Sequence, residues 1–219
     1  MRLGIFGGTF DPVHLGHLIV AEQCREQCAL DEVRFIPAGE PPHKRGRPLT
    51  AAAHRLAMLR FAVAGHSAFR VDDRETKRPG PSYTATTLEE FRDELPQAEL
   101  FLILGRDSLL DLPNWHRPER ICALATLVVA DRPLSRPNGS GSGCAKTQRD
   151  SREPAEQGSR LPPAARIVEI DMPAIGISAT DLRRRVAEGR SIRYFVPRAV
   201  EVYIAQQGLY RGAGTPSTD

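Results

Sequence analysis

The sequence has little cysteine, no long apolar run and almost no excess charge, and each absence narrows what the chain can be. Its 219 residues include four cysteines, Cys24, Cys28, Cys122 and Cys144, which lack the dense spacing of a disulfide-stabilised domain. We therefore expect reduced thiols and a cytoplasmic protein. No stretch approaches the roughly 20 apolar residues of a membrane-spanning helix. The apolar run Leu3–Phe6 is too short for the core of a signal peptide.

The net charge of +3 suits anionic small molecules as well as nucleic acid, and so it selects neither. Hydrophobic residues make up 41% of the chain and charged residues 26%, which is ordinary for a soluble globular protein. The length allows one α/β domain with a substantial core. Cys24 and Cys28 lie one helical turn apart, but no second pair of ligands accompanies them. Their spacing favours two buried side chains on a core face over a zinc site, and we predict no metal bound by protein side chains.

Short apolar runs alternate with longer segments of helical periodicity, as in a doubly wound α/β protein. The expected strands are Arg2–Phe6, Glu32–Pro37, Phe69–Asp72, Glu99–Gly105, Ala125–Ala130 and Arg166–Asp171. The expected helices are Leu15–Cys28, Thr50–Val63 with Thr50 as its N-cap, Tyr83–Leu95, Ala179–Glu188 and Pro197–Gln207. This alternation predicts a Rossmann-like, doubly wound parallel sheet flanked by helices.

The composition changes between residues 133 and 163, where almost no large apolar side chain occurs. Such a stretch buries too little surface to offset the entropy lost on ordering, so we expect a flexible insert there. The resulting interpretation is a single domain over residues 1–211 that contains this insert, followed by a frayed polar tail at 212–219.

The motif GGTFDPVHLGH joins the first expected strand to the first expected helix. Gly7 and Gly8 allow the backbone to approach a ligand closely. The start of the helix offers unpaired N–H groups and a partial positive charge, which together suit a phosphate. His14 and His17 are three residues apart and can lie on one face of that helix start, and Gly16 between them leaves room for a bulky anion. A capped helix start without any ligand explains the same residues equally well.

The motif ISATDLR, at residues 177–183, begins a second helix after a strand and a turn. Ser178 and Thr180 supply hydroxyl donors, and Arg183 supplies a charged fork that suits phosphate. Taken alone, this motif also fits a serine cap followed by a solvated face of arginines.

The two motifs in this order resemble the HxGH and ISxTxxR signatures of the nucleotidyltransferase superfamily. The chain is more closely similar to the bacterial nicotinate-nucleotide adenylyltransferases, from residue 1 to about Arg211. Further landmarks of that family occur in the expected order: Pro41–Lys44 (PPHK), Arg78–Leu88 (RPGPSYTATTL), Leu102–Ile121 (LILGRDSLLDLPNWHRPERI) and Gln206–Tyr210 (QQGLY).

The resemblance implies transfer of the adenylyl group of ATP to nicotinate mononucleotide, giving nicotinate adenine dinucleotide and pyrophosphate in NAD biosynthesis. It implies catalytic roles around the ATP phosphates for His14, His17, Lys44 and Arg183. It places further ATP contacts at strand ends and helix starts, on Gly7, Gly8, Thr9, Phe10, Gly16, Gly105, Asp107, Ile177, Ser178 and Thr180. It places nicotinate mononucleotide on Thr84, Thr86, Trp115 and Arg132, with the single tryptophan stacked on the nicotinate ring.

The implied reaction needs no general base, because the attacking phosphate is already anionic. Positioning and charge stabilisation would carry the catalysis. We expect Mg²⁺ to be carried with ATP and held mainly by its phosphates and by water. Asp11 is the nearby acidic candidate to orient the ion, although a turn-capping Asp-Pro explains Asp11 at least as well.

The expected partners are thus ATP and nicotinate mononucleotide, without nucleic acid or membrane, and a homo-oligomer is left open. Two other functions stay open at this point. One is another adenylyl- or cytidylyltransferase of the same superfamily, and the other is a nucleotide-binding regulator that keeps the fold without the reaction.

Overall fold

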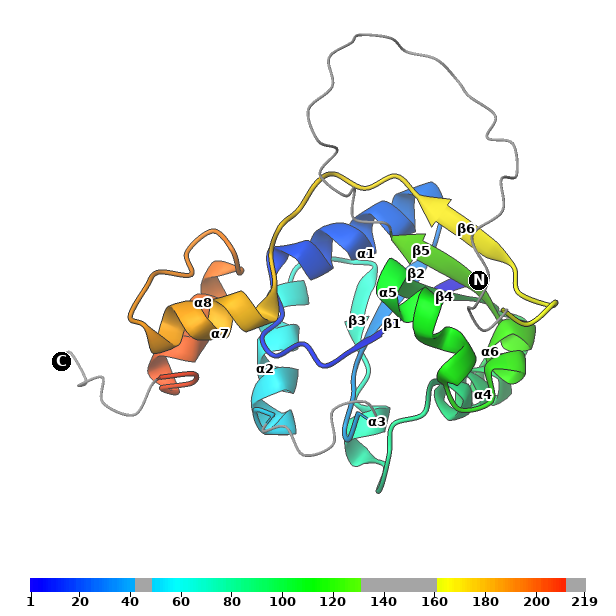
Figure 1. Cartoon of the computed structure of the whole chain (residues 1–219), viewed down its shortest axis with the longest axis horizontal. Helices are drawn as coiled ribbons and strands as arrows, with labels where there is room; N and C mark the ends of the chain where they lie inside the picture. Colours follow the sequence, from blue (N-terminus) through cyan, green and yellow to red (C-terminus); the bar gives the residue numbers. More distant parts are fainter. Residues whose placement is uncertain (42–48, 131–160, 212–219) are drawn as a thin grey trace, which may run out of the picture.

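The computed structural model describes residues 1–41, 49–130 and 161–211. Its centre is a six-stranded sheet in the order β3-β2-β1-β4-β5-β6, in which every neighbouring pair is parallel (Figure 1). The strands are β1 (Arg2–Gly8), β2 (Glu32–Pro37), β3 (Phe69–Val71), β4 (Glu99–Gly105), β5 (Ala125–Ala130) and β6 (Ile167–Ile170). The predicted doubly wound parallel sheet is therefore confirmed. The strand order reverses between β1 and β4, and ligands of such sheets bind beyond the carboxyl ends of the strands at this point.

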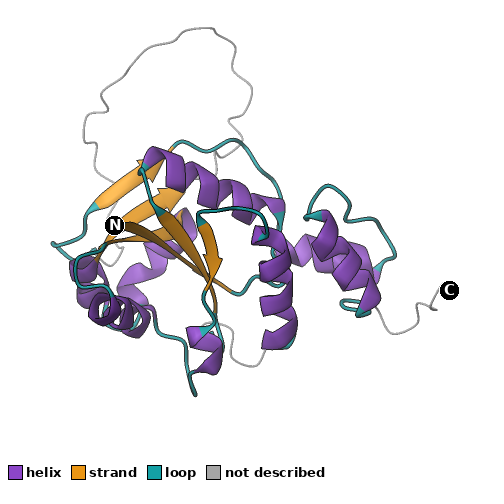
Figure 2. Cartoon of the chain, turned by 180° about the vertical axis from the view of Figure 1, so that it is seen from behind, coloured by secondary structure: helices purple, strands orange, loops and turns teal. Residues whose placement is uncertain are grey.

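Helices cover both faces of the sheet, as Figure 2 shows from behind. They are α1 (Leu15–Gln27), α2 (Ala52–Val63), α3 (Arg74–Lys77), α4 (Thr84–Glu94), α5 (Arg106–Asp111), the 3₁₀ turn η2 (Leu112–Asn114), α6 (Pro118–Leu124), α7 (Ala179–Ala187) and α8 (Arg198–Gln206). Figures 1 and 2 both show α7 and α8 at one end of the molecule, next to α2. The early helix α2 and the late helix α8 thus pack into the same part of the core.

The central strand β4 explains why the core has two parts. Its side chains alternate between the faces, as they must in a strand. Phe101 and Ile103 pack with α1 and α2 on one face, whereas Leu100, Leu102 and Leu104 pack with α4 and α6 on the other. Because both faces are covered, the strand is apolar at consecutive positions, which is typical of parallel sheets.

Tertiary contacts shift some of the predicted boundaries. The strand β1 extends to Gly8, because Gly7 and Gly8 pair with the last residues of β2. The N-cap of α2 is Ala51, so the prediction that Thr50 caps this helix is wrong. The backbone N–H of Thr50 instead donates to Asp11 Oδ2 at 3.3 Å, and its carbonyl accepts from Arg55 Nε at 2.9 Å. The short helices α3, α5 and α6 were not expected, since four to seven residues are too few to show a helical period.

Cys24 on α1 and Cys28 at its C-cap are buried, as predicted, with 0% and 6% of their surface exposed. Burial raises the pKa of the Cys24 thiol to about 12. Over the described ranges, no helix combines the length and the apolar character needed to cross a bilayer. The predicted tail, and the predicted insert apart from residues 161–163, lie outside the described residues.

Candidate functional site

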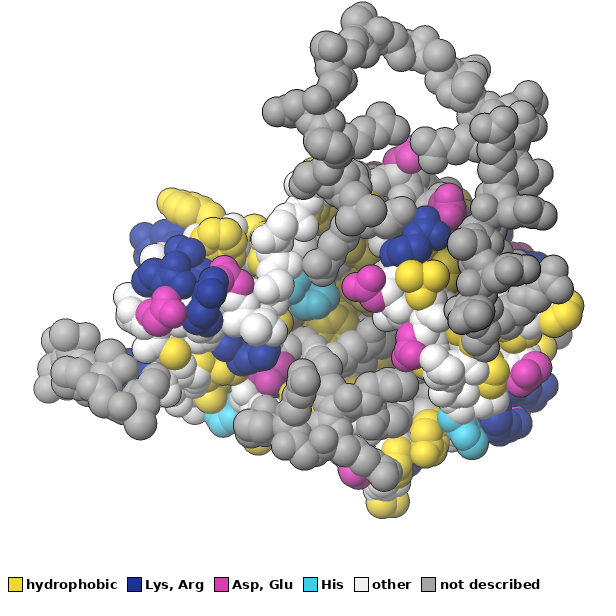
Figure 3. Space-filling view, in the orientation of Figure 1, with side chains coloured by type: hydrophobic (Ala, Val, Ile, Leu, Met, Phe, Trp, Pro, Cys, Tyr) yellow, Lys and Arg dark blue, Asp and Glu magenta, His cyan; other side chains and the backbone are white. Residues whose placement is uncertain are grey.

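Two adjoining cavities open at the carboxyl ends of the central strands. The larger is a cleft of about 780 Å³, lined at the end of β1 by Gly7, Gly8 and Thr9. The smaller has a volume of about 170 Å³ and is lined by the residues His14, Gly16, His17, Gly105 and Ile177, together with Phe6, Val20, Ala130, Met172, Pro173 and Ile175. Figure 3 shows a histidine in a hollow near the middle of this face. The side chain of His17 lines both cavities and therefore lies where they meet.

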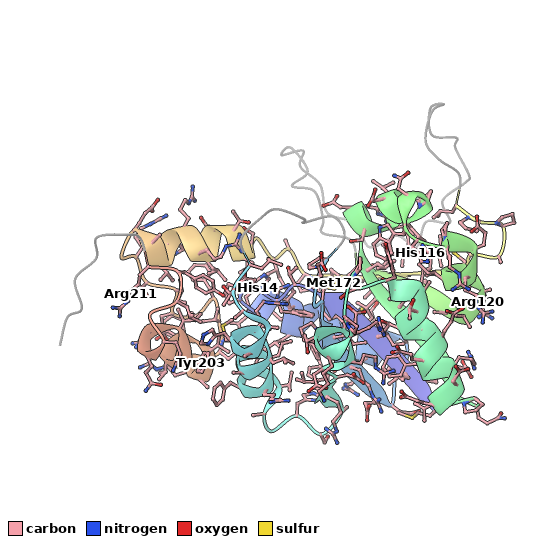
Figure 4. The ribbon with its side chains drawn as sticks, turned by 90° about the horizontal axis from the view of Figure 1, so that it is seen from below. His14, His116, Arg120, Met172, Tyr203 and Arg211 are labelled. Carbon is pink, nitrogen blue, oxygen red and sulfur yellow. The ribbon has the colours of Figure 1, made fainter. Side chains whose placement is uncertain are left out.

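His14 and His17 lie together at the start of α1, as predicted. Their rings stack with centroids 3.7 Å apart and an interplanar angle of 25°. His14 is the N-cap residue and is only 4% exposed (Figure 4). Its backbone N–H donates to Nδ1 of His17 at 3.2 Å. Because Nδ1 of His17 is an acceptor, its neutral ring carries the proton on Nε2, at the opposite side of the ring. His17 can thus present a hydrogen-bond donor while its orientation is held by the backbone.

Phe10, which the resemblance placed among the ATP contacts, lies in the core beside His17. Its side chain is 1% exposed and packs in the core, with an edge contact to the His17 ring at a centroid distance of 5.0 Å. Phe10 is not among the residues that line either cavity, and its side chain supports the His17 ring. Its predicted contact with ATP stays a prediction. Asp107 also lines neither cavity, since it is exposed on the first turn of α5.

The ISATDLR motif begins α7 and reaches the histidine loop through Arg183. Ser178 is the N-cap of α7, and its hydroxyl accepts a hydrogen bond from the backbone N–H of Asp181 at 3.1 Å. The guanidinium of Arg183 donates to the Thr180 hydroxyl at 3.3 Å and to the backbone carbonyl of Asp11 at 2.6 Å. The next arginine, Arg184, pairs with Asp181 on the exposed side of the helix. Of these neighbouring arginines, Arg183 is the one that connects the two motifs.

Asp11 is a structural centre of the loop before α1. It is 3% exposed, and its carboxylate accepts hydrogen bonds from the Tyr210 hydroxyl at 2.6 Å and from the Thr50 backbone N–H at 3.3 Å. Its carboxylate oxygens are therefore engaged within the protein, which favours the structural alternative for Asp11 over metal orientation. Across the described part of the chain, no group of three or more histidine, cysteine, aspartate or glutamate side chains could hold a metal ion.

The larger cleft contains Thr84 and Trp115 among the residues predicted for the mononucleotide, whereas Thr86 does not line it. The indole N–H of Trp115 donates to Asp111 Oδ2 at 3.1 Å, which fixes the plane of the ring. Two further rings line the cleft, those of Tyr83 and His116, with centroids 4.3 Å apart. Figure 4 shows His116 well away from His14, consistent with their places in different cavities. Neither of these two residues was predicted from the sequence.

A buried carboxylate in the larger cleft was also missed. Glu75 is 7% exposed, and the Thr87 hydroxyl donates to its Oε1 at 2.6 Å. Burial raises the pKa of Glu75, although the hydrogen bonds from Thr87 and Ser82 and the charge of Arg78 oppose the rise. The local sequence gave no signal for Glu75, because its burial depends on α4 packing over the very short α3. Lys44 and Arg132 lie outside the described residues, so their roles stay predictions.

Known proteins that are similar to this chain are nucleotidyltransferases. Residues 5–185 match the Cytidylyltransferase-like family. A protein of Thermomicrobium roseum named "Probable nicotinate-nucleotide adenylyltransferase" is 51% identical over 210 residues, covering 96% of this chain and 92% of that protein. A protein of Thermus thermophilus with the same name is 46% identical, over 96% of this chain and 100% of that protein. Another, of Pseudomonas syringae pv. tomato, is 43% identical, over 100% of this chain and 96% of that protein.

Solved structures show the same fold at much lower identity. The nicotinic acid mononucleotide adenylyltransferase of Plasmodium falciparum, complexed with NaAD, superposes with a TM-score of 0.73 at 17% identity, over 95% of this chain and 97% of that chain. A second structure of that protein, complexed with APC, has a TM-score of 0.71 at 17% identity, over 95% and 96% of the two chains.

Proposed function

Because the chain belongs to the Cytidylyltransferase-like family and to the nicotinate-nucleotide adenylyltransferases, we propose that its two adjoining cavities are the two substrate sites of that reaction. The enzyme transfers the adenylyl group of ATP to nicotinate mononucleotide and releases pyrophosphate. The observation that carries our assignment of the site is the position of His17, which lines both cavities. A reaction that joins two nucleotides needs a donor group at the junction of their sites.

The smaller cavity suits the adenosine part of ATP. Its walls are mainly aliphatic, and Gly16 and Gly105 carry no side chain that would narrow it. The larger cleft suits nicotinate mononucleotide, with Trp115 against the nicotinate ring and the start of α4 at Thr84 near its carboxylate. The ATP phosphates would then extend from the smaller cavity past the histidines toward Arg183, with Ser178 and Thr180 on the same helix start.

The chemistry requires positioning and charge stabilisation. The 5′-phosphate oxygen of the mononucleotide attacks the α-phosphorus of ATP in line, and the bond to the bridging oxygen of pyrophosphate breaks. His17 would donate from Nε2 to an oxygen of the α-phosphate, where negative charge increases in the transition state. His14 stacks against His17 and limits its movement. We expect Mg²⁺ to enter with ATP, coordinated by phosphates and water, and to neutralise charge on the leaving group.

Two broader proposals accompany this assignment. We propose that residues 1–211 act as one nucleotidyltransferase domain, since both cavities use strands of one sheet and the smaller cavity joins residues from early and late in the chain. We also propose that the enzyme acts in the cytoplasm, because its described cysteines are buried free thiols. A regulator that only binds nucleotide would have no use for a donor at the junction of two substrate sites.

A steady-state assay of pyrophosphate release tests the proposal, with ATP, Mg²⁺ and either nicotinate or nicotinamide mononucleotide. For His17→Ala we expect kcat to fall about 100-fold or more, as when one transition-state donor is removed elsewhere, with little change in Tm. His66→Ala is the matched control, because His66 stacks on Phe69 and lines neither cavity. If His17→Ala keeps its turnover and loses stability instead, the histidine pair is only a helix cap.

A further inference from the structure

The segment after α8 returns to the loop that precedes the histidines. The landmark QQGLY has no role in the site as described so far, yet it ends in Tyr210, whose hydroxyl donates to Asp11 Oδ1 at 2.6 Å. These two residues are 199 positions apart in the chain. Tyr210 adopts a left-handed backbone conformation with φ of 63°, which is uncommon for a tyrosine. The backbone therefore bends at this residue to direct the phenol inward.

Asp11 connects Tyr210 to the phosphate-binding helix α7. Its carboxylate holds the hydroxyl of Tyr210, and its own backbone carbonyl accepts from Arg183 Nη1 at 2.6 Å. The side chain of Arg55, only 1% exposed, donates to the carbonyls of Thr9 and Thr50 at 2.9 Å each. The loop is thus held from both sides, and its position sets where Arg183 can bond.

The environment keeps the Tyr210 phenol a donor. Burial, together with the hydrogen bond to Asp11, raises the pKa of Tyr210 far above its usual range. The phenol consequently stays protonated at neutral pH and neutralises part of the charge density on Asp11. Without that donor, the buried carboxylate of Asp11 would attract the nearest mobile cation, and Arg183 already contacts the same residue. The guanidinium would then turn from the backbone carbonyl of Asp11 toward its carboxylate and leave the orientation proposed to bind phosphate.

We propose that Tyr210 is a positioning residue for adenylyl transfer: acting through Asp11, it holds the Arg183 guanidinium in the orientation that binds the ATP phosphates. This inference rests on the proposed role of Arg183. It assigns a function to the described residues after α8, which line neither cavity.

The test compares Tyr210→Phe with Tyr203→Phe. Tyr203 is a matched control, because its hydroxyl makes a similar hydrogen bond of 2.9 Å to His54 Nδ1, between α8 and α2 and away from Asp11. For Tyr210→Phe we expect the KM for ATP to rise about tenfold, as for the loss of a hydrogen bond to a charged group. The KM for nicotinate mononucleotide should not change, and Tyr203→Phe should leave both constants at their wild-type values.

A double-mutant cycle with Arg183→Ala tests whether Tyr210 acts through Arg183 or independently of it. If Tyr210 acts through Arg183, adding Tyr210→Phe to Arg183→Ala causes no further loss. If the two residues acted independently, the loss from Tyr210→Phe would add to that from Arg183→Ala. An Arg183→Ala variant with normal ATP kinetics would overturn the proposed role of Arg183. Two results would overturn the positioning role of Tyr210 but not the proposed function, provided that Arg183→Ala is impaired. One is a Tyr210→Phe variant with wild-type kinetics. The other is a Tyr210→Phe variant in which both KM values rise and the Tm falls.

Discussion

Gly16→Ala should separate activity from stability in this enzyme. Gly16 is the second residue of α1 and is buried between the two histidines. A Cβ placed there would lie 3.0 Å from His14 Nδ1 and 3.2 Å from its Cε1, inside the 3.4 Å at which ordinary contacts begin. The His14 ring must therefore move by a few tenths of an ångström, and it would push the His17 ring stacked against it at 3.7 Å.

The size of the effect follows from this displacement. A misplacement of about 1 Å in an active site can cost about 100-fold in rate, so a few tenths of an ångström should cost about tenfold in kcat, or about 1.4 kcal/mol of barrier. The helix itself should not suffer, because alanine is favoured over glycine in a helix by up to about 1 kcal/mol. We thus expect Gly16→Ala to have reduced turnover at an unchanged or higher Tm.

The measurements are pyrophosphate release at saturating substrates and thermal melting of the same preparation. Gly176→Ala serves as the control, because a Cβ on Gly176 would meet nothing within 4 Å. A Gly16→Ala enzyme with wild-type kcat would refute the reasoning, since it would show that the position of the His14 ring does not limit the rate. A drop of several degrees in Tm would contradict the expected stability, because it would show that the added methyl group disrupts the helix start.

Two further predictions concern Glu75 and its neighbour Gly39. Because burial raises the pKa of Glu75 from 4.5, the stability contributed by its protonated form is fully present below pH 4.5 and is lost as the pH rises through the raised value. Relative to Glu75→Gln, the wild-type Tm should therefore fall with increasing pH in thermal melts, and a pH-independent difference would contradict this. A Cβ on Gly39 would overlap the backbone carbonyl oxygen of Glu75, so Gly39→Ala should lower the free energy of unfolding by about 3 kcal/mol. Urea denaturation measures this, and wild-type stability would show that the loop yields without cost.

Local patterns predicted the histidine pair well but not the residues that support it. The spacing of His14 and His17 and the glycine between them were sufficient to place both rings at one helix start. The burial of the Phe10 ring could not be read from its loop sequence, because it depends on packing against Phe35 of β2. Thr50 was misplaced as a cap for a similar reason, since its backbone is bound by Asp11 and Arg55.

The sequence by itself determined the alternation of strands and helices, the placement of the GGTFDPVHLGH and ISATDLR motifs at helix starts and the resemblance that connects them to adenylyl transfer. These features depend on side-chain periodicity and turn chemistry within a few residues, so they can be seen without the fold. Only the tertiary structure decided that His17 lies at the junction of two cavities, that Arg183 and Tyr210 meet at Asp11, and that Glu75 is buried in the larger cleft. The physical reason is distance along the chain: Asp11 contacts residues 172 and 199 positions away, and such contacts exist only after the sheet and its helices have packed.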